Sequence, residues 1–291
     1  HESAAVWTIY HAIDSETANP FQAYQATRYI DTAIPHIPVT AHGLKENGYA
    51  TIATTNWLPY SWSVNNIAFA EVMHTALSYF QAGRAEAGYK LLKSSVLDGM
   101  YLGDSPGNFG QISFYDAARG ECYRDFGDPI GVASRVLIQG LFGILPDALN
   151  QQIILRPGFP DDWDKASVST PDISYRFTRK EDTDTYHITQ RFQTPLHPVL
   201  QINARKEKIR SVKVNGVPAT WQSIESAHGY PLLSIQAEGT SSTTITIEWE
   251  GASLHTLAVQ ELVIASNGKL ALQIPSGASI SQVYDPQSVL A

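Results

Sequence analysis

Two clusters of acidic residues could carry out acid and base chemistry in this sequence. The first lies in the segment HAIDSET and contains Asp14 and Glu16, and the second lies in GECYRDFGDP and contains Glu121, Asp125 and Asp128. Two carboxyl groups that flank a bond can act as the general acid and the general base of a hydrolysis. We therefore expect the second cluster to do acid and base work, with Asp14 or Glu16 across the cleft.

Each of these residues also has a structural interpretation. Asp128 stands before Pro129 and can cap a helix whose first position the proline occupies. Glu121 and Asp125 lie near Arg119 and Arg124, which favours loop ion pairs. An adjacent arginine lowers the pKa of a carboxyl group, which suits a base better than an acid. The first cluster lies in a polar stretch and can be solvated loop charge.

The segment WLPYSWSVNN, residues 57–66, places aromatic side chains beside neutral amides. Flat apolar faces next to amide donors and acceptors are typical of a site for a sugar ring, although tryptophan also fills cores. The glycine-rich turn GDSPGNFG adds an aspartate and an asparagine that either contact hydroxyl groups or only form the turn. The predicted substrate-binding residues are Trp57, Tyr60, Trp62, Asn65, Asn66, Asp104 and Asn108.

Three further motifs do not predict a cofactor. DFG at 125–127 lacks the glycine-rich loop, strand lysine and catalytic loop of a kinase, and GDSPGNFG lacks the ending of a phosphate-binding loop. Glu71 and His74 share one helical face, but a di-iron bundle needs a second such pair and two more glutamates. We interpret this pair as buried and hydrogen-bonded, and we predict neither a metal nor an organic cofactor.

Composition excludes several classes of partner. The net charge is −8 and the isoelectric point is near 5.5, with no basic stripe, so a nucleic acid is not expected. No apolar run is long enough to predict a membrane span. Cys122 is the single cysteine, which excludes an intrachain disulfide. The sequence begins at His1 without a signal peptide, and we interpret it as a processed or truncated piece.

The first 150 residues have a helical pattern. Asn19 and Pro20 suit the start of a helix that Pro35 stops, and apolar residues recur at helical spacing from about 62 to 81 and from 84 to 97. A further helix is predicted after Asp128. The long connections 36–60 and 100–127 are rich in aromatic and polar residues, and long ordered loops are often functional.

After residue 150 the pattern changes to alternating and β-branched residues. VNGV at 214–217 predicts a tight hairpin, because asparagine and glycine tolerate positive φ. We predict an antiparallel β-sandwich or jelly roll over 151–291, in which 254–291 either extends the sandwich or forms a separate strand extension. The sequence thus predicts a two-domain α+β protein with a boundary near 150.

Several segments resemble the six-hairpin glycosidase superfamily. They are SWSVNN, the long segment from 76 to 109, RDFGDPIGVASRVLIQGLFGI and ILRPGFPDDW. The resemblance covers about residues 7–180. Over this range the chain is similar to the C-terminal part of an uncharacterised bacterial glycoside-hydrolase-like protein. It implies an (α/α)6 toroid that holds the site, followed by a β-sandwich, with a periplasmic or secreted location. Since about four helices are predicted of the twelve in a toroid, residues 1–150 are expected to form an incomplete toroid part.

Two functions are consistent with these observations. The first is a glycoside hydrolase that cleaves oligo- or polysaccharides, and the resemblance implies an inverting two-carboxylate mechanism. The second is a non-catalytic carbohydrate-binding or scaffold fragment that completes a toroid with another chain. The expected partners are a carbohydrate and, as the source of the remaining helices, an N-terminal half of the same protein as a separate chain.

Overall fold

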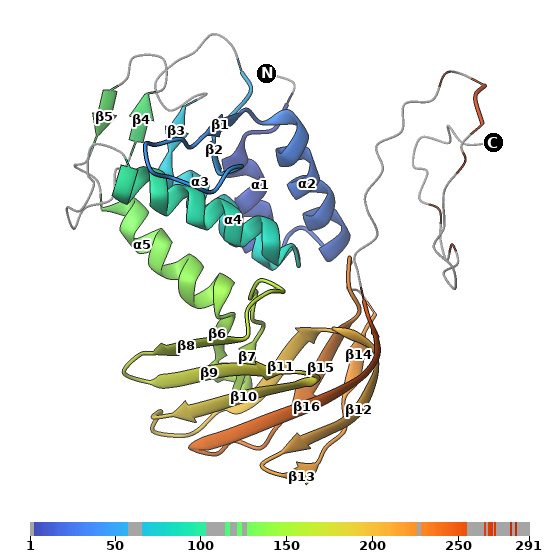
Figure 1. Ribbon diagram of the computed structural model, residues 1–291. Coiled ribbons are helices and arrows are strands. Elements are labelled where there is room, and N and C mark those ends of the chain that lie inside the picture. The colour runs from blue at the N-terminus through green and yellow to red at the C-terminus, as the bar shows by residue number, and fades with distance from the viewer. Residues whose placement is uncertain are drawn as a thin grey trace. The chain divides into compact units, whose positions relative to one another are not determined.

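The computed structural model describes residues 3–57, 66–102, 114–116, 121–123, 127–225 and 228–254, with seven further positions between 265 and 283. His1–Thr256 forms one compact unit and Leu257–Ala291 a second, whose described residues are all exposed. Helices precede a pair of large sheets in the first unit (Figure 1), which confirms the α+β class. The boundary near 150 stays a prediction, and most of the predicted strand extension 254–291 lies outside the described residues.

The helices fall in the first half of the described chain. The α-helices are α1 (Val6–Asp14), α2 (Pro20–Ala33), α3 (Phe69–Gln81), α4 (Ala85–Val96) and α5 (Asp128–Arg135). Two π-helical turns, η1 (Leu97–Leu102) and η2 (Val136–Leu141), continue α4 and α5, and a 3-10 turn, η3 (Ala148–Asn150), follows later. Gly99 therefore does not end the third predicted helix, because the chain continues through it as η1.

The structure confirms the predicted start of one helix and corrects two other predictions about helix ends. Asn19 caps α2 as predicted, because its side chain accepts from the Gln22 amide while Gln22 bonds back to the Asn19 amide. Asp128 is not the cap of α5: Gly127 holds that position without a side-chain bond, and Asp128 is the first helical residue. Asp14 is not in a loop either, since it is the last residue of α1.

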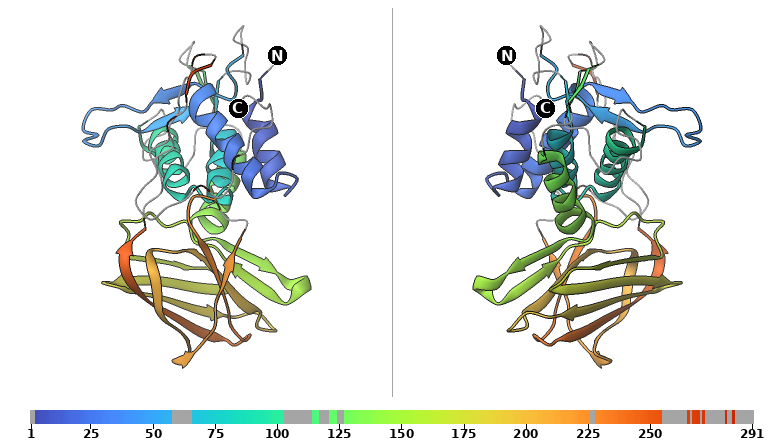
Figure 2. Two further views of the ribbon diagram at one scale, coloured as in Figure 1. Left: turned by 90° about the vertical axis from the view of Figure 1, so that its right-hand side faces the viewer. Right: turned by 90° about the vertical axis from the view of Figure 1, so that its left-hand side faces the viewer.

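The helices alternate in direction between two layers. α1 and α3 run the same way, because Tyr10 contacts Glu71 while Asp14, one turn later, contacts Gln81. α5 runs with them, since Arg135 contacts His74 and Gly140 of η2 lies against Phe80. α2 runs against α3, as Asp31 meets Tyr79 and Tyr24 lies beside Arg84, and α4 returns along α3 after a short turn. Figure 2 shows α1, α3 and α5 beside one another.

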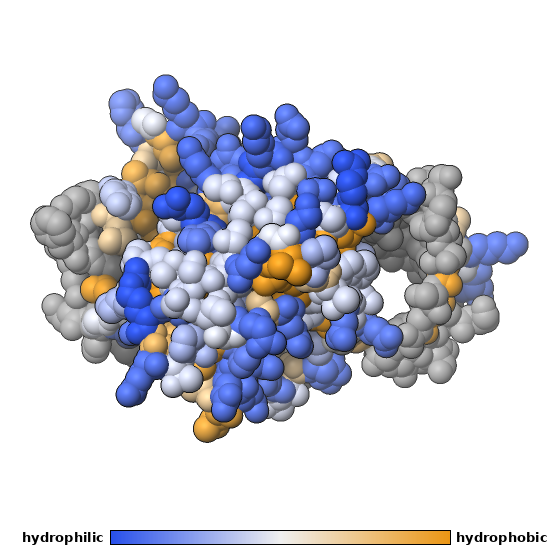
Figure 3. Space-filling view, turned by 90° about the horizontal axis from the view of Figure 1, so that it is seen from below, coloured by the Kyte–Doolittle hydropathy of each residue, from blue (hydrophilic) through white to orange (hydrophobic). Residues whose placement is uncertain are grey.

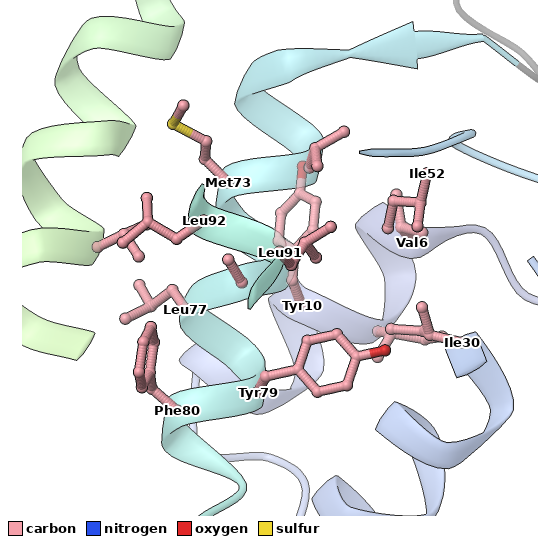
Figure 4. Close-up of a cluster of buried hydrophobic side chains, with 14 of the residues drawn as sticks. Val6, Tyr10, Ile30, Ile52, Met73, Leu77, Tyr79, Phe80, Leu91 and Leu92 are labelled. Carbon is pink, nitrogen blue, oxygen red and sulfur yellow. The ribbon is translucent and has the colours of Figure 1, made fainter. Parts of the chain in front are cut away.

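The core of the helical part surrounds α3. Nine residues of this helix are buried, so apolar side chains point in several directions from it. Figure 4 shows Tyr79 directed toward Ile30 of α2 and Phe80 directed toward α5, with Met73 and Leu77 along the same helix. Because α3 packs against α1, α2, α4 and α5, its position sets the positions of the others.

The described strands form four sheets. The six-stranded sheet contains, in spatial order, β13 (Val217–Pro218), β12 (Lys206–Val214), β16 (Ser242–Ser253), β10 (Thr183–Gln190), β9 (Ile173–Lys180) and β8 (Lys165–Ser169). The five-stranded sheet contains β14 (Gln222–Ile224), β15 (Leu232–Gln236), β11 (His197–Asn203), β7 (Gln152–Leu155) and β6 (Ile144–Asp147). Two small sheets belong to the helical part and contain β1 (His36–Pro38) with β2 (Ala50–Ile52), and β3 (Ile67–Ala68), β4 (Phe114–Asp116) and β5 (Glu121–Tyr123).

The two large sheets share an apolar core, as a sandwich requires. Along β9 and β10 buried residues alternate with less buried ones, which is the period of two that the sequence shows. The predicted hairpin is confirmed, since Val214 pairs with Val217 across a turn in which Asn215 and Gly216 have positive φ. One pairing differs from the fully antiparallel prediction, because β7 and β11 are parallel.

The link between η2 and β6 depends on a glycine. Gly143 has a φ of +65°, and a Cβ atom there would lie 1.9 Å from the carbonyl oxygen of Arg156. We therefore expect Gly143→Ala to lower the free energy of unfolding by more than about 1 kcal/mol in denaturant titrations.

The matched control for that change is Gly131→Ala. Gly131 is exposed within α5 and has open space around its Cα, so alanine should leave stability unchanged or raise it by up to about 1 kcal/mol. Equal destabilisation by both substitutions would contradict the close approach at Gly143.

Candidate functional site

A polar strip runs along the helices α1, α3 and α5. It begins with Tyr10, whose hydroxyl group donates a short hydrogen bond to the carboxylate of Glu71 in the first turn of α3. Burial and this bond to Glu71 raise the pKa of Tyr10, so the phenol keeps its proton and remains a donor. The ring of His74 stacks on Tyr10, with centroids 4.6 Å apart. A carboxylate, a phenol and an imidazole thus lie together between two helices.

Asp14 lies further along the same strip and is bound by two helices. Arg135 of α5 donates to both of its oxygens, at 2.8 and 2.6 Å, and the amide of Gln81 donates at 2.9 Å. Arg135 also lies 3.5 Å from Nε2 of His74. The guanidinium group therefore joins the carboxylate of α1 to the imidazole of α3.

The protonation states follow from these contacts. Burial raises the pKa of Asp14, but the hydrogen bonds from Arg135 and Gln81 outweigh it, and the pKa lies below its ordinary value. Burial and the positive charge of Arg135 lower the pKa of His74, so the imidazole is neutral at neutral pH. Asp14 is consequently an ionised acceptor beside a neutral histidine.

Trp57 lies at the end of the strip where α1 and α3 begin. Its indole N–H donates to the carbonyl and hydroxyl oxygens of Ser3, and its ring meets the Trp7 ring edge to face at 5.8 Å. Both rings are half-buried, so each keeps an exposed part. Asn66 is fully buried, and its backbone pairs with Thr54, which favours a structural role over the predicted sugar contact.

The small sheet β3–β4–β5 brings a predicted acidic residue to this same end. β3 leads directly into α3, and β5, which begins at Glu121, lies two strands away from β3. Neighbouring strands are about 4.8 Å apart, so the backbone of Glu121 lies on the order of 10 Å from the start of α3. The side chain of Glu121 is outside the described part of the structure.

The other predicted site residues lie away from the Asp14–Arg135 pair or outside the described ranges. Asp128 is exposed at the start of α5, seven residues before Arg135, so it lies roughly 10 Å along the helix from the Asp14 pair. Glu16 is exposed, with a φ of +58°, beyond the end of α1. The predicted residues outside the described ranges are Tyr60, Trp62, Asn65, Asp104, Asn108 and Asp125. The pairing of Asp14 with Asp128 across a cleft stays a prediction.

Sequence reasoning missed three members of the strip, Tyr10, Gln81 and Arg135. Tyr10 and Asp14 are four residues apart, and Glu71, His74 and Gln81 follow a helical spacing, so recognising α1 would have placed them on facing helices. Glu71 and His74 were predicted to be buried and hydrogen-bonded. They are hydrogen-bonded, to partners on α1 and α5, but only half-buried. Nothing in the sequence pairs Arg135 with Asp14, because 121 residues separate them.

Asp98 of η1 is a further half-buried carboxyl group in the helical part. Burial raises its pKa above the ordinary value of an aspartate. Because α4 runs opposite to α3, η1 follows at the end where α3 begins. A carboxyl group with a raised pKa suits a proton donor.

The described residues contain neither a metal-binding cluster nor a membrane-spanning helix. Within the ranges the structure covers, no three His, Cys, Asp or Glu side chains gather closely enough to hold a metal ion. None of the helices described there has the length and apolar character needed to cross a bilayer.

Comparison with known proteins gives distant structural matches. No protein-family model and no curated protein sequence matches this chain. An alpha-L-rhamnosidase from Dictyoglumus thermophilum matches 62% of the chain at 15% identity, with a TM-score of 0.40. A GH127 beta-L-arabinofuranosidase from Geobacillus stearothermophilus T6 matches 84% at 9% identity (TM-score 0.34), and a protein described as a glycoside hydrolase matches 74% at 11% identity (TM-score 0.31).

The chain is shorter than these proteins. It covers 21%, 40% and 38% of the three solved chains, in the same order. The three neighbours are glycosidases by name.

The Asp14–Arg135 pair generates a pH-dependent prediction. A carboxyl group whose pKa is lowered by folding stabilises the fold above its unfolded pKa of about 3.9, and this contribution is lost as the pH falls through the folded pKa. Arg135→Gln should therefore lower the free energy of unfolding by about 1 kcal/mol near neutral pH and by less in acid.

A double-mutant cycle with Asp14→Asn checks the assignment. Asp14→Asn should lower the free energy of unfolding little further once Arg135→Gln is present. The control is Lys93→Gln, which removes an exposed ion pair with Glu46 and should show no coupling with Asp14→Asn. Additive effects of Asp14→Asn and Arg135→Gln at neutral pH would contradict the pairing.

Proposed function

We propose that this chain is part of a glycoside hydrolase that cleaves glycosidic bonds in oligo- or polysaccharides. The observation that carries the proposal is the convergence of aromatic and carboxyl groups where α1, α3 and α5 begin. Trp7 and Trp57 supply partly exposed ring faces there, and Tyr10 holds the carboxylate of Glu71 beside them. Sugars are bound by flat apolar faces together with hydrogen-bonding groups, and the positive ends of helices favour negative charge.

The alternating helix directions support a toroid. In an (α/α)6 toroid, an inner layer of parallel helices is surrounded by an outer layer of helices that run the opposite way. Here α1, α3 and α5 run parallel to one another, as inner helices do, and α2 and α4 run against them, as outer helices do. Ile130 and Leu137, seven residues apart on the α5–η2 helix, are 49% and 43% exposed. We propose that further helices cover this stripe, supplied by an N-terminal half of the same protein or by a separate chain.

The roles follow from position and protonation. Asp98, whose pKa burial raises, is the proposed proton donor, and Glu71 or Glu121 is the proposed base of an inverting mechanism. Asp125 and Asp128 remain candidates in the same segment, while Asp14 is assigned to positioning through Arg135.

The remaining parts of the proposal come from the sequence. Trp57, Tyr60, Trp62, Asn65, Asp104 and Asn108 are proposed to bind sugar, and Asn66 to hold the segment in place. The proposal includes no cofactor, and it places the protein in the periplasm or outside the cell.

One observation favours the non-catalytic alternative. The oxygens of Asp14, a carboxylate predicted to be catalytic, are occupied by Arg135 and Gln81, which leaves that group structural. A carbohydrate-binding or scaffold fragment would keep its sugar affinity when the carboxylates are replaced.

The decisive test is sugar release from a panel of plant and host oligosaccharides. Asp98→Asn, and whichever of Glu71→Gln and Glu121→Gln removes the base, should reduce kcat by orders of magnitude while the circular dichroism spectrum is unchanged. Activity of the unmodified protein should fall as the pH rises through the raised pKa of Asp98, because the donor then loses its proton.

The matched control is Glu86→Gln. Glu86 occupies the first turn of α4 in the other helix layer, as Glu71 does in α3, and it is exposed. The Glu86→Gln variant should retain the full turnover of the unmodified protein. Sugar binding without turnover in the unmodified protein would instead support the binding module.

A further inference from the structure

The open edge of the β-sandwich contains a hollow of about 320 Å³. One side is formed by Gln152, His197, Val199 and Gln236, all on the five-stranded sheet. The strand register explains their grouping, because His197 lies opposite Gln152 and Val199 lies opposite Gln236. The other side comes from the hairpin of β12 and β13 in the six-stranded sheet and contains Val214, Val217, Pro218 and Ala219.

The two sides differ in chemistry. Valine, proline and alanine side chains make an apolar wall, whereas the opposite side supplies two neutral amides and an imidazole, with the carboxylate of Glu238 at the rim. Figure 3, which views the molecule from the side where Figure 1 places β13, shows small apolar patches among hydrophilic and neutral residues. Since no lysine or arginine lines the hollow, it does not suit an anion.

The tautomer of His197 is fixed by the backbone. The N–H of Gly239 donates to Nδ1 of His197 at 3.0 Å, so Nδ1 is an acceptor and the ring proton is on Nε2. Glu238 lies 3.6 Å from the same Nδ1, too far for a hydrogen bond and on the unprotonated nitrogen, so this contact is not an ion pair.

Gly239 is itself held closely. A Cβ atom at this position would lie 2.8 Å from the carbonyl oxygen of Pro195, so a larger residue would displace the amide that orients His197. The imidazole is therefore an oriented Nε2–H donor, and the neighbouring glutamines can both donate and accept.

We propose that this hollow binds one neutral pyranose unit of a carbohydrate. A pyranose has hydroxyl groups that both donate and accept, and C–H faces that pack on aliphatic side chains, which match the two sides of the hollow. Its volume lies at the lower end of the range of about 300 to 1,000 Å³ for small-molecule sites, which is enough for one ring. This binding site lies on the sandwich, and its existence does not depend on catalysis by the helical part.

The test is an NMR titration of the isotope-labelled chain with methyl glucopyranoside, methyl galactopyranoside and methyl xylopyranoside. At least one of these should shift the backbone signals of Gln236, Ala237 and Gly239 with a dissociation constant in the millimolar range. Cyclohexanol, which keeps the ring but has one hydroxyl group, and inorganic phosphate should produce no saturable shift.

Three variants make the assignment specific. His197→Ala should weaken binding by about tenfold, the loss expected for one hydrogen bond. Val217→Asp changes an apolar wall residue that is 64% exposed, so it should weaken binding without unfolding the sheet. His187→Ala is the matched control, because His187 is an exposed histidine on β10 outside the hollow, and it should retain full affinity.

The proposal is overturned if none of the three pyranosides shifts these signals. It is also overturned if the shifts persist unchanged in both His197→Ala and Val217→Asp, or if phosphate binds more tightly than every pyranoside.

Discussion

The packing of one aromatic ring against three glycines determines how the helices meet the sandwich. Phe80, near the end of α3, lies against Gly88 of α4, Gly140 of η2 and Gly158 between β7 and β8. A Cβ atom at Gly140 or Gly158 would lie 2.6 or 2.3 Å from the ring, so only glycine permits these approaches. Because α3 is fixed at this end against the other segments, its beginning is fixed where the acidic and aromatic groups gather.

The polar strip is a consequence of that arrangement. α3 buries its apolar side chains against four helices, and its remaining positions, Glu71, His74 and Gln81, meet the polar positions of α1. Arg135 extends the strip to α5 and holds Asp14 ionised. Half-buried titratable groups with altered pKa values are frequent at functional sites, although structural ion pairs produce the same effect.

Much of the fold was predictable because its signals are local. The capping box of α2, the Asn215–Gly216 hairpin and the change of period after 150 all depend on residues close in sequence. The helix α1 was missed because its polar end resembles a loop, and the start of α5 was misplaced because Gly127 takes the cap position from Asp128. The site was less predictable, since the Tyr10–Glu71 and Asp14–Arg135 contacts join residues 61 and 121 positions apart.

The central claim is that sugars bind where α1, α3 and α5 begin, and tryptophan indole signals test it most directly. The labelled protein would be titrated with the panel of plant and host oligosaccharides, with the fully buried Trp249 of the sandwich as an internal reference. The account predicts that a bound sugar shifts the indole signals of Trp57 and Trp7 and leaves that of Trp249 unchanged. A sugar that the protein cleaves, or that binds without shifting Gly239 of the sandwich hollow, and that shifts neither Trp7 nor Trp57 would contradict it.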